Sequence, residues 1–147
     1  MKGGHWLDVQ DPWALLHDLL PFLAGSAHVA FEGEHGALPL PAGLASSREG
    51  HGVLKRIAHA NPDPDFLLVP LEPDTVERVL AFVDSICADA SRAERVWHIT
   101  VAQHGVLQLG AYDNFHEDCV VAGPSIVTAR LERLKARGVL RGYADCT

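Results

Sequence analysis

The chain has few cysteines, few positive charges and no long hydrophobic run. Its three cysteines are an odd number and lie far apart, which favours reduced thiols over a disulfide framework. Twelve Lys and Arg stand against 19 Asp and Glu, a net charge of -7, which disfavours non-specific nucleic-acid binding because that needs clustered cations. No run of about 18 apolar residues could span a bilayer, and the start lacks the apolar core of a secretory signal. We therefore expect a cytoplasmic protein that binds neither membrane nor nucleic acid.

Motifs that bind cofactors or catalyse reactions are also missing. The glycines form neither GxGxxG nor GxxxxGK[ST], and no serine lies in a GxSxG elbow. The nine histidines are scattered without HExxH spacing, and no paired CxxC or EF-hand loop occurs. The sequence therefore predicts no cofactor and no metal, and it names no reaction.

What the chain does contain predicts one globular domain over residues 1–147. Its 147 residues are 48% apolar and 21% charged, which is ordinary for a packed domain. Periodicity predicts helices over 12–20, 73–90 and 125–137, with one or two helical turns within 53–60. It predicts strands over 27–32, 66–71, 96–103, 106–113, 119–122 and 140–144, and an exposed loop over 33–50. The expected fold is α/β (α+β), with a central mixed, largely antiparallel sheet packed by about three helices.

A tight hairpin is expected at His104-Gly105, because a two-residue turn containing glycine matches the twist of the strands. With two residues in the turn, Val101 would pair with Gln108 and Thr100 with Leu109. The same register places His98 opposite Ala111, and Trp97 opposite Tyr112.

The densest polar cluster, residues 113–119, follows this hairpin, and loops at strand ends often carry function. Asp113 and His116, with Asp118 or Cys119, are possible metal ligands, although no ligand spacing supports them. Cys119 is a possible nucleophile with His116 or His98 as its base. Acidic neighbours raise a thiol pKa, however, and so favour an inert cysteine.

The same cluster also suits a protein-binding surface. Aromatic side chains supply contact area at low entropy cost, and carboxylates attract and pair with a basic partner. The alternative is a solvated turn in which Asp113 and Asn114 bond their own backbone and Phe115 enters the core. The candidate partner-binding residues are Glu32, Glu34, Tyr112, Asp113, Phe115, Glu117 and Asp118.

The segments 96–99 and 110–119, with Phe31-Glu32-Gly33-Glu34 upstream, resemble small bacterial proteins. These include immunity proteins of contact-dependent inhibition and polymorphic toxin systems. The resemblance implies a non-enzymatic inhibitor that binds a cognate toxin domain, often a nuclease, and blocks its active site. An acidic chain suits such a basic partner. The alternatives are a metal-assisted hydrolase centred on Asp113, His116 and Asp118, and a structural or scaffold subunit.

Overall fold

The protein is described by a computed structural model that covers residues 2–39, 43–58 and 60–146. It forms seven strands and four helices. The strands are β1 (His5–Val9), β2 (Ala27–Gly33), β3 (Asp65–Leu71), β4 (Val96–Gln103), β5 (Val106–Ala111), β6 (Val120–Ala122) and β7 (Leu140–Asp145). The helices are α1 (Pro12–Leu23), α2 (Val76–Cys87), α3 (Ala90–Glu94) and α4 (Thr128–Ala136).

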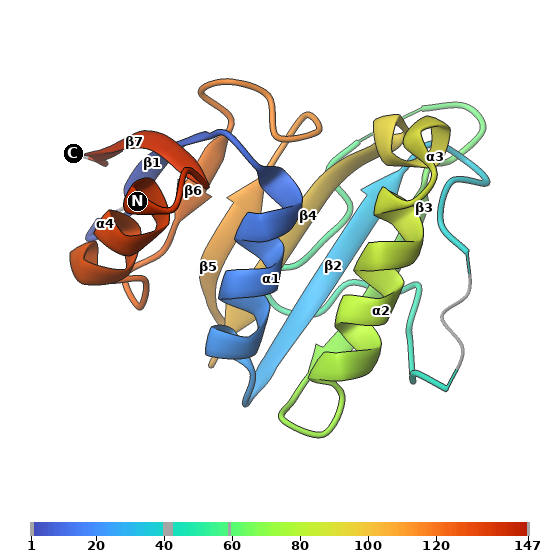
Figure 1. The fold of residues 1–147 in the computed structure, drawn as a ribbon. Helices are drawn as coiled ribbons and strands as arrows, with labels where there is room; N and C mark the ends of the chain where they lie inside the picture. The colour runs from blue at the N-terminus through green and yellow to red at the C-terminus, as the bar shows by residue number, and fades with distance from the viewer. Residues whose placement is uncertain (1, 40–42, 59, 147) are drawn as a thin grey trace.

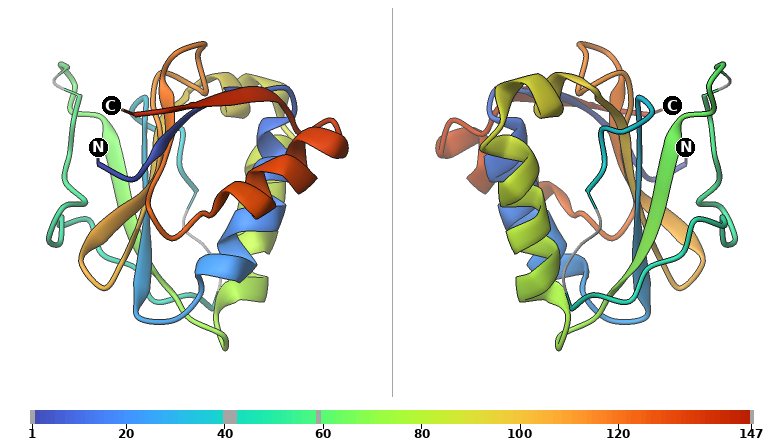
Figure 2. Two further views of the ribbon diagram at one scale, coloured as in Figure 1. Left: turned by 90° about the vertical axis from the view of Figure 1, so that its left-hand side faces the viewer. Right: turned by 90° about the vertical axis from the view of Figure 1, so that its right-hand side faces the viewer.

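All seven strands belong to one sheet, in the order β3-β2-β4-β5-β6-β1-β7 (Figure 1). The α+β class and the single sheet agree with the prediction, and every strand pairing is antiparallel. Helices α1, α2 and α4 cover one face of the sheet (Figure 2). No helix within the described residues is both long and apolar enough to cross a membrane.

The connection between β2 and β3 covers parts of both faces. Leu38 and Leu44 join the main core with the helices. Ser47 then pairs with Leu68 at the edge of β3, and Leu54 joins a second apolar cluster on the opposite face. The expectation of an exposed loop over 33–50 is therefore wrong for Leu38 and Leu44, which are buried, while residues 40–42 lie outside the described part of the chain.

The hairpin has the predicted two-residue turn, and His104 and Gly105 both have positive φ values, 50° and 77°. Next to the turn, Ala102 pairs with Leu107 as expected, but the register then shifts by one residue. The predicted pairing of Val101 with Gln108 is wrong, because Gln108 is the extra residue of a β-bulge and Val101 pairs with Leu109. The pairings predicted for Thr100, His98 and Trp97 beyond the bulge are wrong for the same reason.

The bulge has a tertiary cause. The carbonyl of Gln108 accepts a hydrogen bond from Gly123 N at 2.8 Å, and its Oε1 accepts one from Ser125 N at 2.9 Å. Gln108 therefore holds the connection between β6 and α4. A one-residue shift reverses the face of every later side chain, so Leu109 enters the main core beneath the helices.

Helix α1 begins at Pro12 as predicted, with the side chain of Asp11 accepting a hydrogen bond from Ala14 N at 3.1 Å. It does not end near Leu20, because Pro21 is accommodated inside the helix, which continues to Leu23. Pro21 and His17 lie on the exposed side, where water can bond the carbonyl that proline leaves free. Burial of the Leu23 side chain stabilises this extra turn of helix.

Other boundaries were predicted less well. The helix expected over 73–90 is shorter, since α2 runs from Val76 to Cys87, and the separate helix α3 that follows from Ala90 to Glu94 was not predicted. The helix expected from residue 125 begins at Thr128. The helical turns expected within 53–60 are absent from 53–58 and 60, the part of that segment that the structure describes. Gly138 does end α4 in the left-handed conformation, and Val139 N donates to Leu134 O at 2.9 Å beyond it.

Candidate binding surface

The loop between β5 and β6, residues 112–119, has an unusual backbone. Tyr112 N donates a hydrogen bond to Cys119 O at 2.9 Å, which closes the loop at its base. Inside it, Asp113, Asn114, Phe115 and Asp118 have φ values of 51°, 56°, 58° and 64°. Left-handed backbone costs about 1 kcal/mol per non-glycine residue, so contacts with the rest of the protein must impose this shape.

Asn114 and Phe115 supply those contacts. The side-chain amide of Asn114 donates to Ala93 O and Val96 O, each at 2.6 Å, and its backbone N donates to Trp97 O at 2.7 Å. Phe115 is half-buried and packs against Trp13 of α1, with ring centroids 6.1 Å apart. The loop is therefore fixed to the start of β4 on one side and to α1 on the other.

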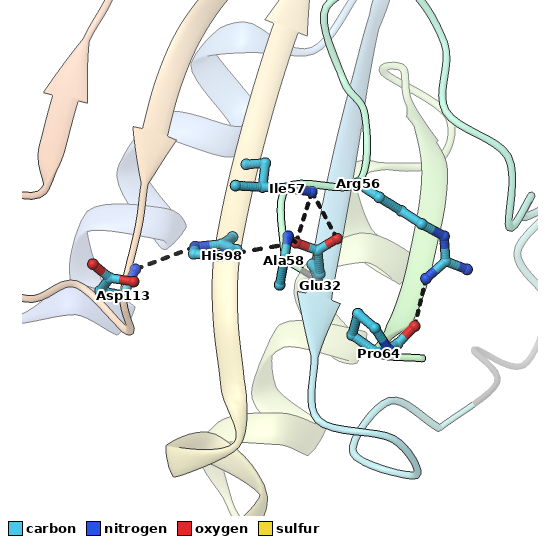
Figure 3. Close-up of polar contacts among 7 residues, drawn as sticks. All are labelled: Glu32, Arg56, Ile57, Ala58, Pro64, His98 and Asp113. Atoms are coloured by element: carbon cyan, nitrogen blue, oxygen red, sulfur yellow. Dashed lines mark hydrogen bonds and ion pairs between the residues drawn. The ribbon is translucent and has the colours of Figure 1, made fainter. Parts of the chain in front are cut away.

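A chain of polar contacts connects the loop to β2 (Figure 3). Asp113 N donates to His98 Nδ1 at 3.2 Å, which requires that this ring nitrogen carry no proton. His98 Nε2 lies 3.9 Å from Glu32 Oε1. The Glu32 carboxylate accepts hydrogen bonds from Ile57 N at 3.0 Å and from Ala58 N at 2.8 Å.

Glu32 must be removed from the predicted binding residues. Its side chain is only 2% exposed, and its carboxylate is occupied by the backbone of Ile57 and Ala58. It lies on the sheet face opposite the helices, where the end of the connection between β2 and β3 covers it, so it acts as an internal anchor for that connection. The two-residue alternation of β2 could not reveal this, because the segment that buries Glu32 has no regular structure.

The other predicted residues gather at one end of the sheet. Glu34 is exposed, and its backbone N donates to Arg95 O at 2.9 Å, beside the start of β4. Across β4, Asp113, Glu117 and Asp118 are also exposed. Tyr112 is half-buried over Gly110, where an added Cβ would lie 2.6 Å from its ring. Burial raises the pKa of the Tyr112 phenol, which therefore stays neutral near neutral pH.

Two clefts lie on either side of Glu117. The first, about 290 Å³, lies between the loop and strands β1 and β7, and is lined by Asp8, Val9, Phe115, Glu117 and Arg141. The second, about 280 Å³, is lined by residues that include Trp6, Asp8, Glu117, Asp118 and Tyr143. Both combine carboxylates with aromatic side chains, and Arg141 in the first cleft is paired with Asp8 at 3.2 Å. Glu117 therefore remains available to a cationic side chain of a protein partner, and the aromatic residues to an apolar one.

Residues from β1 and β7 were missed at the sequence level. Trp6 is 47% exposed and Asp8 lines both clefts. The signal was present in the alternation of Leu7 and Val9 with Trp6 and Asp8, a pattern typical of a strand with one buried face. The pattern is short, and only the pairing of β1 between β6 and β7 brings it to the loop.

The arrangement gives little support to catalysis by Cys119 or to a metal site in this loop. The Cys119 thiol lies 3.7 Å from Asp113 Oδ2 and 4.0 Å from His116 Nδ1, while His116 Nδ1 bonds Glu117 O at 2.8 Å. Desolvation, the charge and hydrogen bond of Asp113, and the charge of Asp118 all raise the pKa of Cys119. Within the described residues, no group of three His, Cys, Asp or Glu side chains is placed to hold a metal ion.

We expect Cys119 to react slowly with iodoacetamide at neutral pH, because its raised pKa lowers the thiolate fraction. Exposed Cys87 should react faster. D113N preserves side-chain size and tolerates positive φ, and by removing one charge it should speed Cys119 labelling severalfold. Peptide mass spectrometry over time measures both rates. Equal rates for the two cysteines in the wild type, or no effect of D113N, would contradict this account.

Comparison of the chain with protein-family models, with curated proteins and with solved structures gives no match in any of the three.

Proposed function

We propose that this chain is a non-enzymatic inhibitor of the immunity-protein kind, which binds a basic, nuclease-type toxin domain by direct contact. The contact surface consists of Glu34, the loop 112–119 and the two clefts beside Glu117. The acidic residues pair with cations that the toxin uses to bind phosphate, and the aromatic residues of the clefts provide apolar area. Such an inhibitor acts in the cytoplasm, where its three thiols stay reduced.

One observation carries the proposal: the exposed carboxylates at this end of the sheet form no ion pair within the described part of the chain, and Arg141 of the first cleft is paired with Asp8. Among the residues that the structure describes, none forms an ion pair with Glu34, Asp113, Glu117 or Asp118. Exposed carboxylates that are not paired within the chain create a negative potential that attracts a basic surface and accelerates its capture.

The fixed backbone of the loop supports the same proposal. A loop already held in its binding shape loses little conformational entropy on association. The bonds of Asn114 and the packing of Phe115 against Trp13 supply that restraint. Half-exposed Trp6, which lines the second cleft, offers a further aromatic contact.

The test begins with the partner. Tagged protein is used to capture partners from native lysate at low and at high salt, and mass spectrometry identifies them. The proposal expects a basic toxin domain in stoichiometric amount, retained better at low salt. Its affinity is then compared with that of the triple variant D113N/E117Q/D118N, which removes charge but keeps side-chain size and tolerates the left-handed backbone at 113 and 118.

The triple variant should bind the toxin domain about 10- to 100-fold more weakly, with a flatter salt dependence. A matched control, E49Q/D74N/E77Q, removes the same charge from exposed residues elsewhere and should retain nearly full affinity. Equal affinities for the two triple variants would refute this surface. If the purified chain without toxin catalyses the turnover of a substrate, the proposal of a non-enzymatic inhibitor is refuted.

A further inference from the structure

The sheet has two edge strands, β3 and β7. Among the described residues, only β3 has a segment paired with its outer side. At the edge of β3, Ser47 N donates to Leu68 O at 2.8 Å and Leu68 N donates to Ser47 O at 2.7 Å. Pro70 on the same strand has no N–H to offer. In contrast, no described residue pairs with the outer side of β7, and in the left view of Figure 2 no other element lies in front of it.

The register of β1 with β7 shows which backbone groups point outward. Cys146 N donates to Gly4 O at 3.0 Å, and the pairs His5–Asp145, Trp6–Ala144 and Leu7–Tyr143 follow in order. Hydrogen-bonded and non-bonded pairs alternate in an antiparallel ladder, so Ala144 bonds Trp6 of β1. The N–H and C=O groups of Tyr143 and Asp145 consequently face away from the sheet.

We propose that the outer edge of β7 pairs with β7 of a second copy of this chain, antiparallel and with Tyr143 at the two-fold axis. Each Tyr143 then donates its N–H to the carbonyl of the other Tyr143. The same register places Arg141 of each copy opposite Asp145 of the other. Each of the two charged side chains has a partner in its own chain and is still exposed: Asp145 is 80% exposed and lies 3.1 Å from His5 Nε2, and Arg141 is 53% exposed and lies 3.2 Å from Asp8 Oδ1. The contact between copies therefore adds a second partner to each of these charges.

The charges select this register over its neighbours. Centring the axis on Asp145 would set two carboxylates opposite one another, which destabilises a cross-strand pair. Centring it on Gly142 would pair strands through groups that already bond β1. Arg141 is the extra residue of a β-bulge between the pairs Asp8–Gly142 and Val9–Leu140. Its contact with Asp145 of the second copy is therefore made by the side chains, whereas Tyr143 makes the backbone hydrogen bonds between the two strands.

The contact rests on one short strand, so we expect a weak dimer that dissociates on dilution. Sedimentation equilibrium of the purified chain, from micromolar to millimolar concentration, measures it. R141D and D145R each set like charges opposite one another, and each should weaken dimerisation by about tenfold or more. An equimolar mixture of the two variants restores both opposite-charge pairs, and it should form a heterodimer at least as stable as the wild-type dimer.

Hydrogen exchange gives a second measurement. The amides of Tyr143 and Asp145 should become protected as concentration rises, whereas the amide of Ala144, bonded inside the sheet, should be protected at all concentrations. A wild-type chain that stays monomeric up to millimolar concentration would overturn the proposal. So would a dimer that both single variants leave unchanged, or single variants whose mixture fails to associate while circular dichroism shows that each is folded.

Discussion

Replacing Glu32 with alanine should lower the free energy of unfolding by about 3 kcal/mol. The buried carboxylate accepts the backbone N–H groups of Ile57 and Ala58, and no other acceptor in the described residues bonds them. A hydrogen bond to a charged group contributes about 1.5–3 kcal/mol. Because Ile57 is 45% exposed, water can replace part of the lost bonding, and we take the lower end of that range for each of the two donors. In a chain of this length the loss corresponds to a fall in melting temperature of about 10 °C, which thermal denaturation followed by circular dichroism measures.

E32Q is the matched control for this experiment. Its side-chain carbonyl keeps one acceptor in nearly the same position, so we expect it to lose about half as much stability as the alanine variant. Limited proteolysis should cleave the segment around Ile57 and Ala58 faster in E32A than in the wild type, because Glu32 anchors that segment to β2. An unchanged melting temperature in E32A would mean that the connection is held by its apolar contacts and not by the carboxylate.

Replacing Gly123 with alanine should be equally damaging, at a cost of about 3 kcal/mol. An added Cβ at this position would overlap the Leu107 carbonyl and would lie 2.7 Å from Gln108 Cα. Both obstacles are backbone atoms of β5, so no side-chain rotation relieves the overlap. Gly123 N also donates to Gln108 O at 2.8 Å, so moving the chain away would break the bond that ties the connection before α4 to the bulge.

The control is G142A. Gly142 lies in β7 with nothing within 4 Å of an added Cβ, and its φ is not in the left-handed region. We expect this substitution to change stability by no more than about 0.5 kcal/mol. Urea denaturation of the two variants with a common slope compares them directly. If G123A is as stable as G142A, the close approach of Gly123 to Leu107 and Gln108 of β5 is not a constraint on the fold.

Much of the fold could be predicted because its signals are local. The caps at Asp11 and Gly138, the turn at His104-Gly105 and the apolar stripe of α2 each depend on a few consecutive residues. The acidic and aromatic cluster after β5 was also visible as residue types in one short segment. Its fixed left-handed backbone was not, because bonds to β4 and packing on α1 impose it.

The sequence by itself therefore determined the class of the fold, most of its helices and strands, and the acidic loop that our proposed function uses. Only the tertiary structure decided the register beyond Gln108, the burial of Glu32, and the place of Trp6 and Asp8 beside Glu117. Each of these depends on contacts between segments far apart in the chain. Local periodicity carries no information about such contacts, because their free energy comes from burial and hydrogen bonds that exist only once the sheet has assembled.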